Sequence, residues 1–550
     1  MATFKTAHQA LIEWAGQCPD RPFLHQPLHG GVNIYTWSQS ENISRRLAAA
    51  FLDLGLRPGD RIALLGKNCA EWVLADFAIA MAGMISVPIY PTAGRKTIKH
   101  VIAHSEAKAI IVGKIDDQQS VSGALPQGIL SIAMPYDGIN CDHTWQSLVD
   151  SNEPLQELNE PDPGDVMTIL YTSGSTGEPK GVVISYRAYH YSSHAAIAAS
   201  RLDSEDRVLS YLPLAHVTER TCSVGPVIYA GSQGFFVDSL KTFQRDLRYA
   251  RATGFTSVPR LWVQFQSAVH SKIPPRKLSF MLRIPILRNV VARKLREQLG
   301  FSHSSRFSSG SAPISPLTIK WYQRIGIEIG EGWGMTETSG LSCGNIPFRA
   351  DRVGTIGVPV EGTEIRLSDE NEILIRGPGL FTEYYKQPDL TKESFSDDGF
   401  FHTGDKGEWV ENAEAYRITG RVKDQFKSAK GKYVVPVPIE AMMSGNPFIE
   451  QICVMGSGLR APVAVVVLSQ SAGGAAPEEI EKSLSSTLDD VNHTLESHEK
   501  LARIVIVNDE WTIENDLLTP TMKIKRALLE EKYQQLISRD QAGKIQWENR

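Results

Sequence analysis

Short apolar runs alternate with helical patterns in the first part of the chain, and this alternation restricts the fold more than any other feature of the sequence. Buried strands are predicted by three short apolar runs, at residues 61–65, 85–90 and 109–112. Helices are predicted by the spacing of apolar residues at 5–16, 40–55 and 72–81. Strands that alternate with helices build α/β layers around mostly parallel sheets. Residues 117–165 are richer in Pro, Asp and Gly, and we expect a connecting segment there.

The length of the chain and a change in its composition predict two domains. A chain of 550 residues exceeds what one hydrophobic core usually holds together. After Gly420, a charged bridge precedes a smaller unit. This unit has predicted strands at 452–455 and 461–468 and predicted helices at 477–498 and 524–537. We therefore expect a large multi-sheet α/β domain over residues 1–420, a hinge over 421–424 and a small mobile α+β domain over 425–550.

Charge and cysteine use exclude several classes of protein. The net charge of −5 gives no overall reason to expect nucleic-acid binding. The six cysteines are scattered without a CxxC pair, which excludes a disulfide framework and a zinc site and fits a reducing compartment. The uncharged run 77–94 is interrupted by Ser86, Pro88 and Pro91, so we expect buried sheet and loop rather than a membrane span. The N-terminus lacks the apolar core of a signal peptide. We expect a cytoplasmic protein, with peripheral attachment to the inner face of a membrane left open.

One loop predicts anion binding. Residues 171–181, Tyr-Thr-Ser-Gly-Ser-Thr-Gly-Glu-Pro-Lys-Gly, place three glycines, four serine or threonine hydroxyls and a lysine between predicted strands at 166–171 and 182–184. Glycine allows the backbone to approach an anion closely, and Lys180 adds a point charge suited to phosphate. The spacing differs from a Walker loop, in which Gly-Lys-Ser/Thr opens a helix. A plain surface hairpin is the alternative interpretation.

This string resembles the phosphate loop of the adenylate-forming superfamily, which includes acyl-CoA synthetases, beetle luciferases and peptide-synthetase adenylation domains. The likeness extends to the last thirty residues of the chain. The resemblance implies a reaction that begins with a carboxylate attacking the α-phosphorus of ATP, and it implies Mg²⁺ as cofactor and coenzyme A as a further substrate. It also implies that the loop binds nucleotide through Thr172, Ser173, Gly174, Ser175, Thr176, Gly177 and Lys180.

A second motif, Gly330-Glu-Gly-Trp-Gly-Met-Thr-Glu-Thr338, combines an aromatic ring with oxygen ligands. Trp333 is suited to stack on adenine, and the side chains of Thr336 and Glu337 offer the hard oxygens that Mg²⁺ prefers. A Thr-Glu pair is also typical of a helix cap or a solvated turn. The resemblance implies that Thr336 contacts phosphate and substrate carboxylate and that Glu337 holds Mg²⁺. The nucleotide pocket it implies also includes Gly310, Ser311, Ala312, Glu331, Gly332, Trp333, Gly334 and Met335.

Further site residues follow from the same resemblance. Asp405 matches the carboxylate that accepts the ribose hydroxyls, Arg421 matches a second ribose and phosphate contact, and Lys423 falls at the hinge position. Lys523 aligns with the lysine used in adenylation, although Lys525 is a neighbouring competitor. Lys427 opens a basic group, residues 427–433, which the resemblance turns toward the site for thioester formation. An exposed basic loop is the alternative for that group.

Three stretches resemble the long-chain fatty acyl branch: Tyr-Leu-Pro-Leu-Ala-His-Val-Thr-Glu-Arg at 211–220, Tyr-Lys-Gln-Pro at 385–388 and Thr-Pro-Thr-Met-Lys-Ile-Lys-Arg at 519–526. The likeness places His216 beside the substrate carboxylate and the acyl tunnel. Arg220 stands where some bacterial members carry a gating tryptophan. The resemblance therefore implies a long-chain fatty acid–CoA ligase acting on fatty acid, ATP and CoA. The alternatives are a fatty acyl-AMP ligase that loads an acyl carrier protein and a catalytically silent nucleotide-binding regulator. A homodimer is left open.

Residues 272–296 are strongly basic. They contain eight Lys or Arg and no acidic residue, interleaved with Ile, Leu, Phe and Val. One interpretation is a solvated helical face that covers the sheet. The other is a landing patch for anionic lipid or for the phosphates of coenzyme A.

Overall fold

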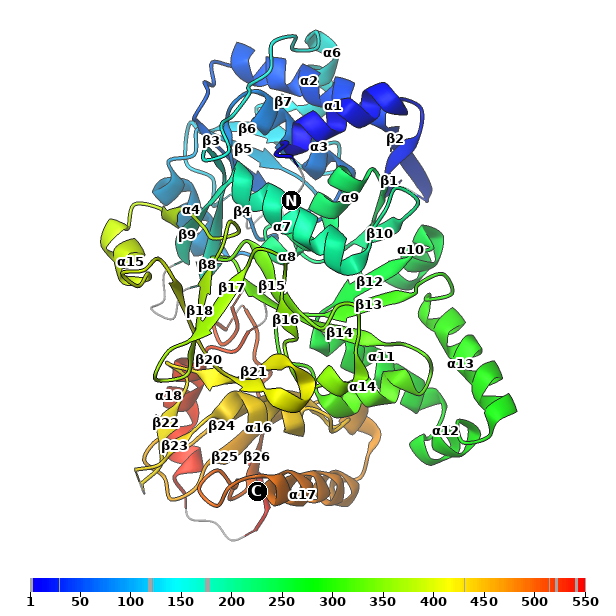
Figure 1. Ribbon diagram of the computed structural model, residues 1–550, viewed down its shortest axis with the longest axis vertical. Coiled ribbons are helices and arrows are strands. Elements are labelled where there is room, and N and C mark those ends of the chain that lie inside the picture. Colours follow the sequence, from blue (N-terminus) through cyan, green and yellow to red (C-terminus); the bar gives the residue numbers. More distant parts are fainter. Residues whose placement is uncertain are drawn as a thin grey trace.

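The computed structural model describes residues 3–28, 30–116, 121, 123–173, 179–429, 431–513, 515–519, 523–539 and 543–549. Figure 1 shows a large N-terminal α/β domain above a smaller C-terminal domain. The predicted fold class is therefore confirmed. In the described part of the chain, no helix combines the length and the apolar character needed to cross a bilayer.

An eight-stranded sheet carries the predicted phosphate loop. Its strands run in the order β19 (Glu383–Tyr384), β9 (Pro179–Ser185), β8 (Val166–Ser173), β4 (Ile85–Ile89), β3 (Arg61–Leu65), β5 (Ala109–Val112), β6 (Leu130–Ala133) and β7 (His143–Thr144). The pairs from β8 to β7 are parallel, while β8–β9 is an antiparallel hairpin. The expectation of a mere connecting segment over 117–165 is wrong, because β6, β7 and α6 (Trp145–Ser151) lie within it. The strand β6 is only four residues long, and Ser131 interrupts its apolar sequence.

A nine-stranded sheet carries the predicted adenine motif. Its order is β16 (Val358–Pro359), β15 (Gly340–Gly344), β14 (Ile329–Met335), β13 (Arg306–Ser309), β12 (Gly254–Ser257), β10 (Arg207–Ser210), β11 (Gln233–Phe236), β1 (Pro22–Leu28) and β2 (Gly31–Thr36). The strands from β14 to β1 pair in parallel. The carboxyl ends of parallel strands lie along one side of a sheet. The residues after β13 and those within β14 therefore lie near each other on that side.

Helices pack against these sheets as the apolar spacing predicts. The helices α1 (Ala7–Gln17) and α2 (Trp37–Asp53) each begin at a capping box, in which Thr6 and Thr36 accept a hydrogen bond from the backbone N–H three residues on. The helix α3 (Ala70–Met81) is buried at almost every position, which explains its continuous apolar sequence. The helix α7 (Tyr186–Ser200) lies over the front of the molecule in Figure 1.

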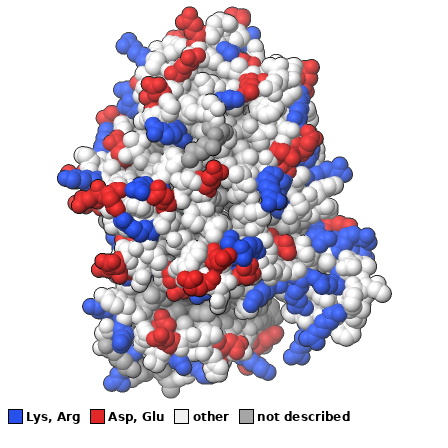
Figure 2. Space-filling view, viewed as in Figure 1, with Lys and Arg blue, Asp and Glu red and all other residues white. Residues whose placement is uncertain are grey.

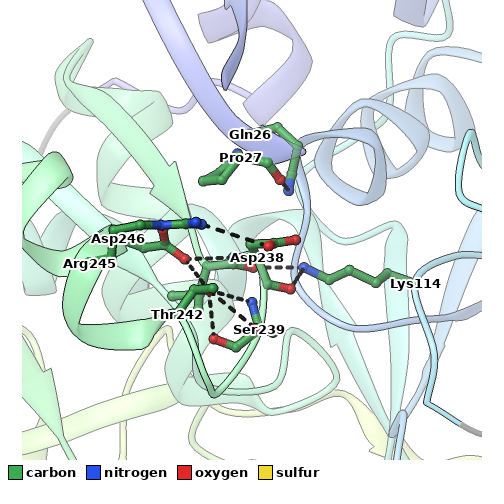
Figure 3. A network of polar contacts seen from close by, with 9 residues as sticks. Gln26, Pro27, Lys114, Asp238, Ser239, Thr242, Arg245 and Asp246 are labelled. Carbon is green, nitrogen blue, oxygen red and sulfur yellow. Dashed lines mark hydrogen bonds and ion pairs between the residues drawn. The ribbon is translucent and has the colours of Figure 1, made fainter. Parts of the chain in front are cut away.

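Buried polar groups tie the two sheets together. Lys114, just after β5, donates hydrogen bonds to the carbonyl oxygens of Val237 (2.6 Å) and Asp238 (3.0 Å), just after β11. Asp246 fixes the segment after β11, because its carboxylate accepts hydrogen bonds from the Asp238 N–H and from the Thr242 hydroxyl (Figure 3). Burial lowers the pKa of Lys114. These bonds fix the ends of β5 and β11 relative to each other, and the site is built on the sheets they join.

The chain after residue 425 builds its own core. An antiparallel sheet, β17 (Glu364–Leu367), β18 (Glu372–Arg376), β20 (Phe401–Val410) and β21 (Ala415–Arg421), precedes it. The final sheet contains β24 (Ile449–Met455), β25 (Val463–Leu468), β26 (Ile504–Val507) and β27 (Ile545–Trp547), with helices α16 (Pro436–Met443), α17 (Pro477–Thr494) and α18 (Arg526–Ile537). Among the described residues, no buried hydrophobic cluster contains members from both sides of residues 402–425.

Candidate active site

The hairpin β8–β9 presents Lys180 to a carboxylate from the second sheet. The Lys180 ammonium lies 3.5 Å from Oε1 of Glu337 and 3.7 Å from the centre of the Tyr384 ring. The Tyr384 hydroxyl donates to the same Glu337 oxygen at 2.9 Å. Burial lowers the pKa of Lys180, while Glu337 opposes that shift. The pair places one cation and one carboxylate at the entrance of the predicted phosphate loop.

The loop itself lies mostly outside the described residues. Gly174, Ser175, Thr176 and Gly177 are not described, nor is the side chain of Ser173. At the described start of the loop, the Thr172 hydroxyl is buried and has no hydrogen-bond partner among the described residues. A buried hydroxyl of this kind costs free energy unless a ligand oxygen satisfies it. Thr172 therefore fits the nucleotide-binding role implied for it.

Two histidines contact residues at the two ends of this loop, and neither was predicted as a site residue. On α4 (Arg95–Ser105), Nε2 of His100 lies 3.0 Å from the Pro179 carbonyl oxygen, and Nδ1 of His104 lies 2.8 Å from the Tyr171 hydroxyl. Their spacing of four residues puts both rings on one helix face. That spacing is their only signal in the sequence.

A second group of contacting side chains consists of Trp333, Asp405 and Arg421. The indole N–H of Trp333 donates to Oδ2 of Asp405 at 3.0 Å, and Nε of Arg421 donates to Oδ1 at 2.7 Å. Asp405 and Arg421 face each other because β20 and β21 pair in antiparallel register. The Asp405 carboxylate raises the pKa of Arg421. This group has the carboxylate, cation and aromatic ring that a nucleoside site needs.

Glycines let the hairpin β14–β15 fold tightly beside this group. A Cβ on Gly334 would lie 1.5 Å from the Gly340 carbonyl oxygen, so no other residue fits there. Ser311 has a left-handed backbone (φ 67°), and its hydroxyl lies 3.5 Å from that of Thr218. A Cβ on Gly310 would lie only 3.1 Å from the carbonyl oxygen of Gly332. Non-glycine residues with a left-handed backbone, such as Ser311, cluster at functional sites. Ala312 follows on the exposed surface and Met335 closes β14.

Glu331 is an unusual member of the pocket. Its Oε2 accepts a hydrogen bond from the Gly354 N–H at 3.0 Å. Burial raises the pKa of this carboxyl group to about 8. Glu331 is therefore mostly protonated at neutral pH and adds little negative charge to its surroundings.

Lys523 of the C-terminal domain reaches these carboxylates. Desolvation and the charge of Arg421 lower its pKa, while Asp405 and Glu337 raise it. Lys523 nevertheless stays exposed to solvent over part of its surface. Lys525 points elsewhere and pairs with Asp516. The structure therefore separates the two candidate lysines.

His216 lies near enough to Lys523 for the lysine charge to affect its pKa. Burial and the charge of Lys523 lower the pKa of His216 to about 4, so the ring is neutral at physiological pH. Its Nδ1 accepts the Thr218 N–H at 3.2 Å, which leaves the ring proton on Nε2. His216 can therefore donate one hydrogen bond to an oxygen in the site, but it is a weak base.

Arg220 is pinned in place. Its guanidinium pairs with Asp76, donates to the Thr168 hydroxyl at 2.7 Å and lies over the rings of Trp72 and Tyr189. Arg220 opens the short π-helix Arg220–Val224, and a small cavity lies beside it. With so many partners, Arg220 cannot swing as an apolar gate would.

Lys427 and Lys423 do not join the central group in this pose. Lys427 is exposed on β22 (Phe426–Lys427), with its ammonium 5.0 Å from the centre of the Tyr433 ring. Lys423 is exposed in the turn after β21, and its charge lowers the pKa of Lys180. The Thr336 side chain is half-buried next to Glu337.

The donor set fits Mg²⁺. Among the described residues, no group of three or more His, Cys, Asp or Glu side chains is arranged so that it could hold a metal ion. Mg²⁺ needs no such cluster, because it usually takes one or two protein carboxylates together with phosphates and water. Glu337 beside the phosphate loop supplies one such carboxylate.

Comparisons with known proteins agree with this geometry. A model of the AMP-binding enzyme family matches residues 11–385, and a model of the AMP-binding enzyme C-terminal domain matches residues 423–541. Fatty acyl-CoA synthetase A of Dictyostelium discoideum is 30% identical, covering 94% of this chain and 87% of that protein. A peroxisomal long chain acyl-CoA synthetase of Arabidopsis thaliana is 28% identical, covering 92% and 82%.

The solved structures show the same fold. The A-PCP didomain of a carboxylic acid reductase from Segniliparus rugosus, in complex with AMP, has a TM-score of 0.81 at 21% identity. It covers 98% of this chain and 82% of that one. The chain therefore belongs to the AMP-binding enzyme family, in the long-chain acyl-CoA synthetase branch of ATP-dependent acid–thiol ligases.

Proposed function

We propose that this protein is a long-chain fatty acid–CoA ligase that works in two steps. In the first step, the carboxylate of the acid attacks the α-phosphorus of ATP, which forms acyl-AMP and releases pyrophosphate. In the second step, the thiol of coenzyme A attacks the acyl carbonyl, which forms acyl-CoA and releases AMP. The observation that carries the proposal is the position of Lys523, close enough to Asp405 and Glu337 for their charges to oppose the lowering of its pKa by desolvation and Arg421.

The first step has to bring two anions together, so it depends on cations and orientation more than on acid–base catalysis. Lys180 and Lys523 approach the site from opposite domains, and we assign them to the phosphates and to the developing charge. Glu337 would hold Mg²⁺, which supplies charge neutralisation at the phosphates. Thr336 is assigned to the α-phosphate and the substrate carboxylate.

The nucleoside is assigned to the group at the β14 rim. Asp405 would accept the ribose hydroxyls, Arg421 would steady the ribose and phosphate, and Trp333 would contact adenine. The residues at 310–312 and 331–335 would line the pocket. Hydrogen bonds already orient the Asp405 carboxylate from two sides, so little side-chain freedom would be lost on binding.

The second step is proposed to need a rotation of the C-terminal domain. We propose domains at 1–420 and 425–550 with a hinge at 421–424, which the separate buried clusters support. The rotation would withdraw Lys523 and bring the face around Lys427 toward the site. Lys427 would then meet coenzyme A.

The acyl side of the site is assigned to His216 and its surroundings. A neutral His216 that donates from Nε2 would orient the substrate carboxylate without taking its proton. We also propose a cytoplasmic location with peripheral attachment to a membrane. We further propose a homodimer, and light scattering would measure its molecular mass.

The deciding experiment measures pyrophosphate release with ATP, Mg²⁺ and a panel of acids from C2 to C18, aryl acids included, followed by CoA addition. We expect release to be fastest with long aliphatic acids and thioester to form with CoA. Release without CoA thioester would instead indicate a fatty acyl-AMP ligase for a carrier protein. No release with any acid would indicate a nucleotide-binding regulator.

A further inference from the structure

The helices α12 (Pro275–Met281) and α13 (Pro285–Leu299) form a hairpin that projects from the side of the N-terminal domain (Figure 1). Its inner face is firmly packed. The buried residues Leu278, Val291 and Leu295 join the same hydrophobic cluster as Trp262 and Phe301. The hairpin is therefore a fixed part of the domain, and its outer face is presented to solvent in one orientation.

The tip of the hairpin is apolar and exposed. Of the thirteen large hydrophobic side chains that are exposed among the described residues, five lie within residues 280–290: Phe280, Ile284, Ile286, Leu287 and Val290. Phe280 is 64% exposed and Ile286 is 79% exposed. Single exposed apolar residues are common on soluble proteins, whereas a cluster of this kind marks an interaction site.

Basic side chains surround this tip. Seven of the eight Lys and Arg in this stretch are exposed: Lys272, Arg276, Lys277, Arg283, Arg288, Arg293 and Lys294. Within the described part of the chain, only Arg293 of these seven pairs with an acidic side chain, Glu297, at 3.8 Å. In Figure 2 they form a blue area over α12 and α13 at the lower right. The protein as a whole carries a net charge of −5, so the positive charge is concentrated on one projection.

We propose that this hairpin docks the protein onto an anionic phospholipid bilayer. The apolar tip would enter the interfacial region while the surrounding Lys and Arg contact lipid phosphates, as in other peripheral segments with both features. Coenzyme A phosphates explain the pattern less well. A small anion is bound by groups that converge on a concave site, whereas these cations spread over a projecting surface, and CoA phosphates do not account for the apolar tip.

The benefit of docking rests on the proposed function, because long-chain acids partition into bilayers and a docked ligase would meet its substrate there. The docking itself depends only on the hairpin. Vesicle binding and ligase activity can therefore be measured separately, and the failure of one does not imply the failure of the other.

The test is flotation of the full chain with vesicles of phosphatidylcholine alone or with about one-third phosphatidylglycerol. We expect binding to the anionic vesicles only, weakening with salt. The variant Arg276→Gln/Lys277→Gln/Arg283→Gln/Arg288→Gln should lose at least about tenfold in partition coefficient, since each basic residue near such a surface contributes substantially. The variant Phe280→Ser/Ile286→Ser should also bind more weakly, yet keep the salt dependence.

A matched control removes four exposed charges elsewhere, with Arg57→Gln, Arg187→Gln, Lys392→Gln and Lys482→Gln. The control should bind as the unchanged protein does, and every variant should keep its melting temperature and its ligase rate on a soluble medium-chain acid without vesicles. The proposal is overturned if the unchanged protein does not float with anionic vesicles, or if the hairpin variants bind as well as the control. A raised KM for CoA with unchanged vesicle binding would overturn it in favour of CoA phosphates.

Discussion

At the scale of single residues, the site separates two lysines that lie two positions apart. Lys523 is coupled to Asp405 and Glu337, whereas Lys525 is paired with Asp516. We expect Lys523→Ala to slow pyrophosphate release by about 10²- to 10³-fold, the usual cost of removing one group that stabilises transition-state charge. The measurement is single-turnover acyl-AMP formation with saturating ATP.

Lys525→Ala is the matched control, because it also removes one ammonium group, but one that pairs with Asp516 and lies away from Asp405 and Glu337. It should retain most of the rate. If Lys525→Ala lost as much activity as Lys523→Ala, the assignment of the adenylation lysine would fail.

His216 makes a prediction about pH. Its pKa is lowered to about 4, below the ordinary value of 6.5, so the ring stays neutral as the pH falls from 7 to 5. The pH profile of kcat/KM over that range should therefore have the same shape in His216→Asn as in the unchanged protein. The rate itself should fall by about tenfold, because the shorter asparagine side chain places no donor at the position of Nε2. An acid limb near pH 6.5 that disappears in the variant would show instead that His216 titrates during catalysis.

At the scale of elements, β14 places a protonated carboxyl group inside the proposed nucleotide pocket. The folded-state pKa of Glu331 is raised to about 8, so the stability linked to this group is fully present below about pH 4.5 and is lost as the pH rises toward 8. Glu331→Gln keeps an acceptor for the Gly354 N–H and cannot ionise. Its stability should be close to that of the unchanged protein at pH 5 and higher by on the order of a few kcal/mol at pH 9.

Urea unfolding at both pH values, followed by tryptophan fluorescence, measures this difference. Glu328→Gln, on an exposed residue three positions earlier, serves as the control and should show no such dependence. A constant difference between Glu331→Gln and the unchanged protein at both pH values would contradict the raised pKa.

Elements with continuous apolar patterns were the most predictable part of the structure. The strand at residues 61–65 and the helix near 72–81 were predicted almost to their ends, because hydrophobic periodicity reports burial directly. The short strand β6 was missed because four residues carry too little periodicity. The tyrosine beside Lys180 could not be predicted either. Tyr384 reaches Lys180 because β19 pairs with β9, a contact between residues two hundred positions apart in the chain.

The same limit applied to the candidate site. Sequence motifs identified Asp405, Trp333 and Arg421 as candidates. They did not predict that the Asp405 carboxylate accepts hydrogen bonds from both Trp333 and Arg421. The contacts of Arg220 were equally hidden, since Asp76 and Trp72 come from α3 and Thr168 from β8, all far from Arg220 in the sequence. Local sequence identifies residue types suited to a chemistry, while their joint geometry depends on long-range strand pairing and packing.

At the scale of the whole molecule, an ion pair joins the two domains in the arrangement that we assign to the first step. Arg260 on α11 (Pro259–Lys272) pairs with Glu450 on β24 across the domain boundary, and Lys523 lies beside His216. The Arg260–Glu450 pair is partly exposed, so it contributes no more than about 1 kcal/mol. An ion pair this weak would not by itself prevent the proposed rotation of the C-terminal domain.

Lys423 provides the test of that motion. Proline fixes φ, so Lys423→Pro should hinder the change of backbone angles on which a rotation at 421–424 depends. Because Lys523 already lies in the site, we expect acyl-AMP formation to continue at within about threefold of the unchanged rate, while thioester formation from preformed acyl-AMP and CoA falls by about 10²-fold or more. Lys423→Ala removes the same charge without fixing φ and should keep both steps. Equal losses of both steps in the proline variant, or equal losses of thioester formation in both variants, would mean that the chain does not turn at this residue.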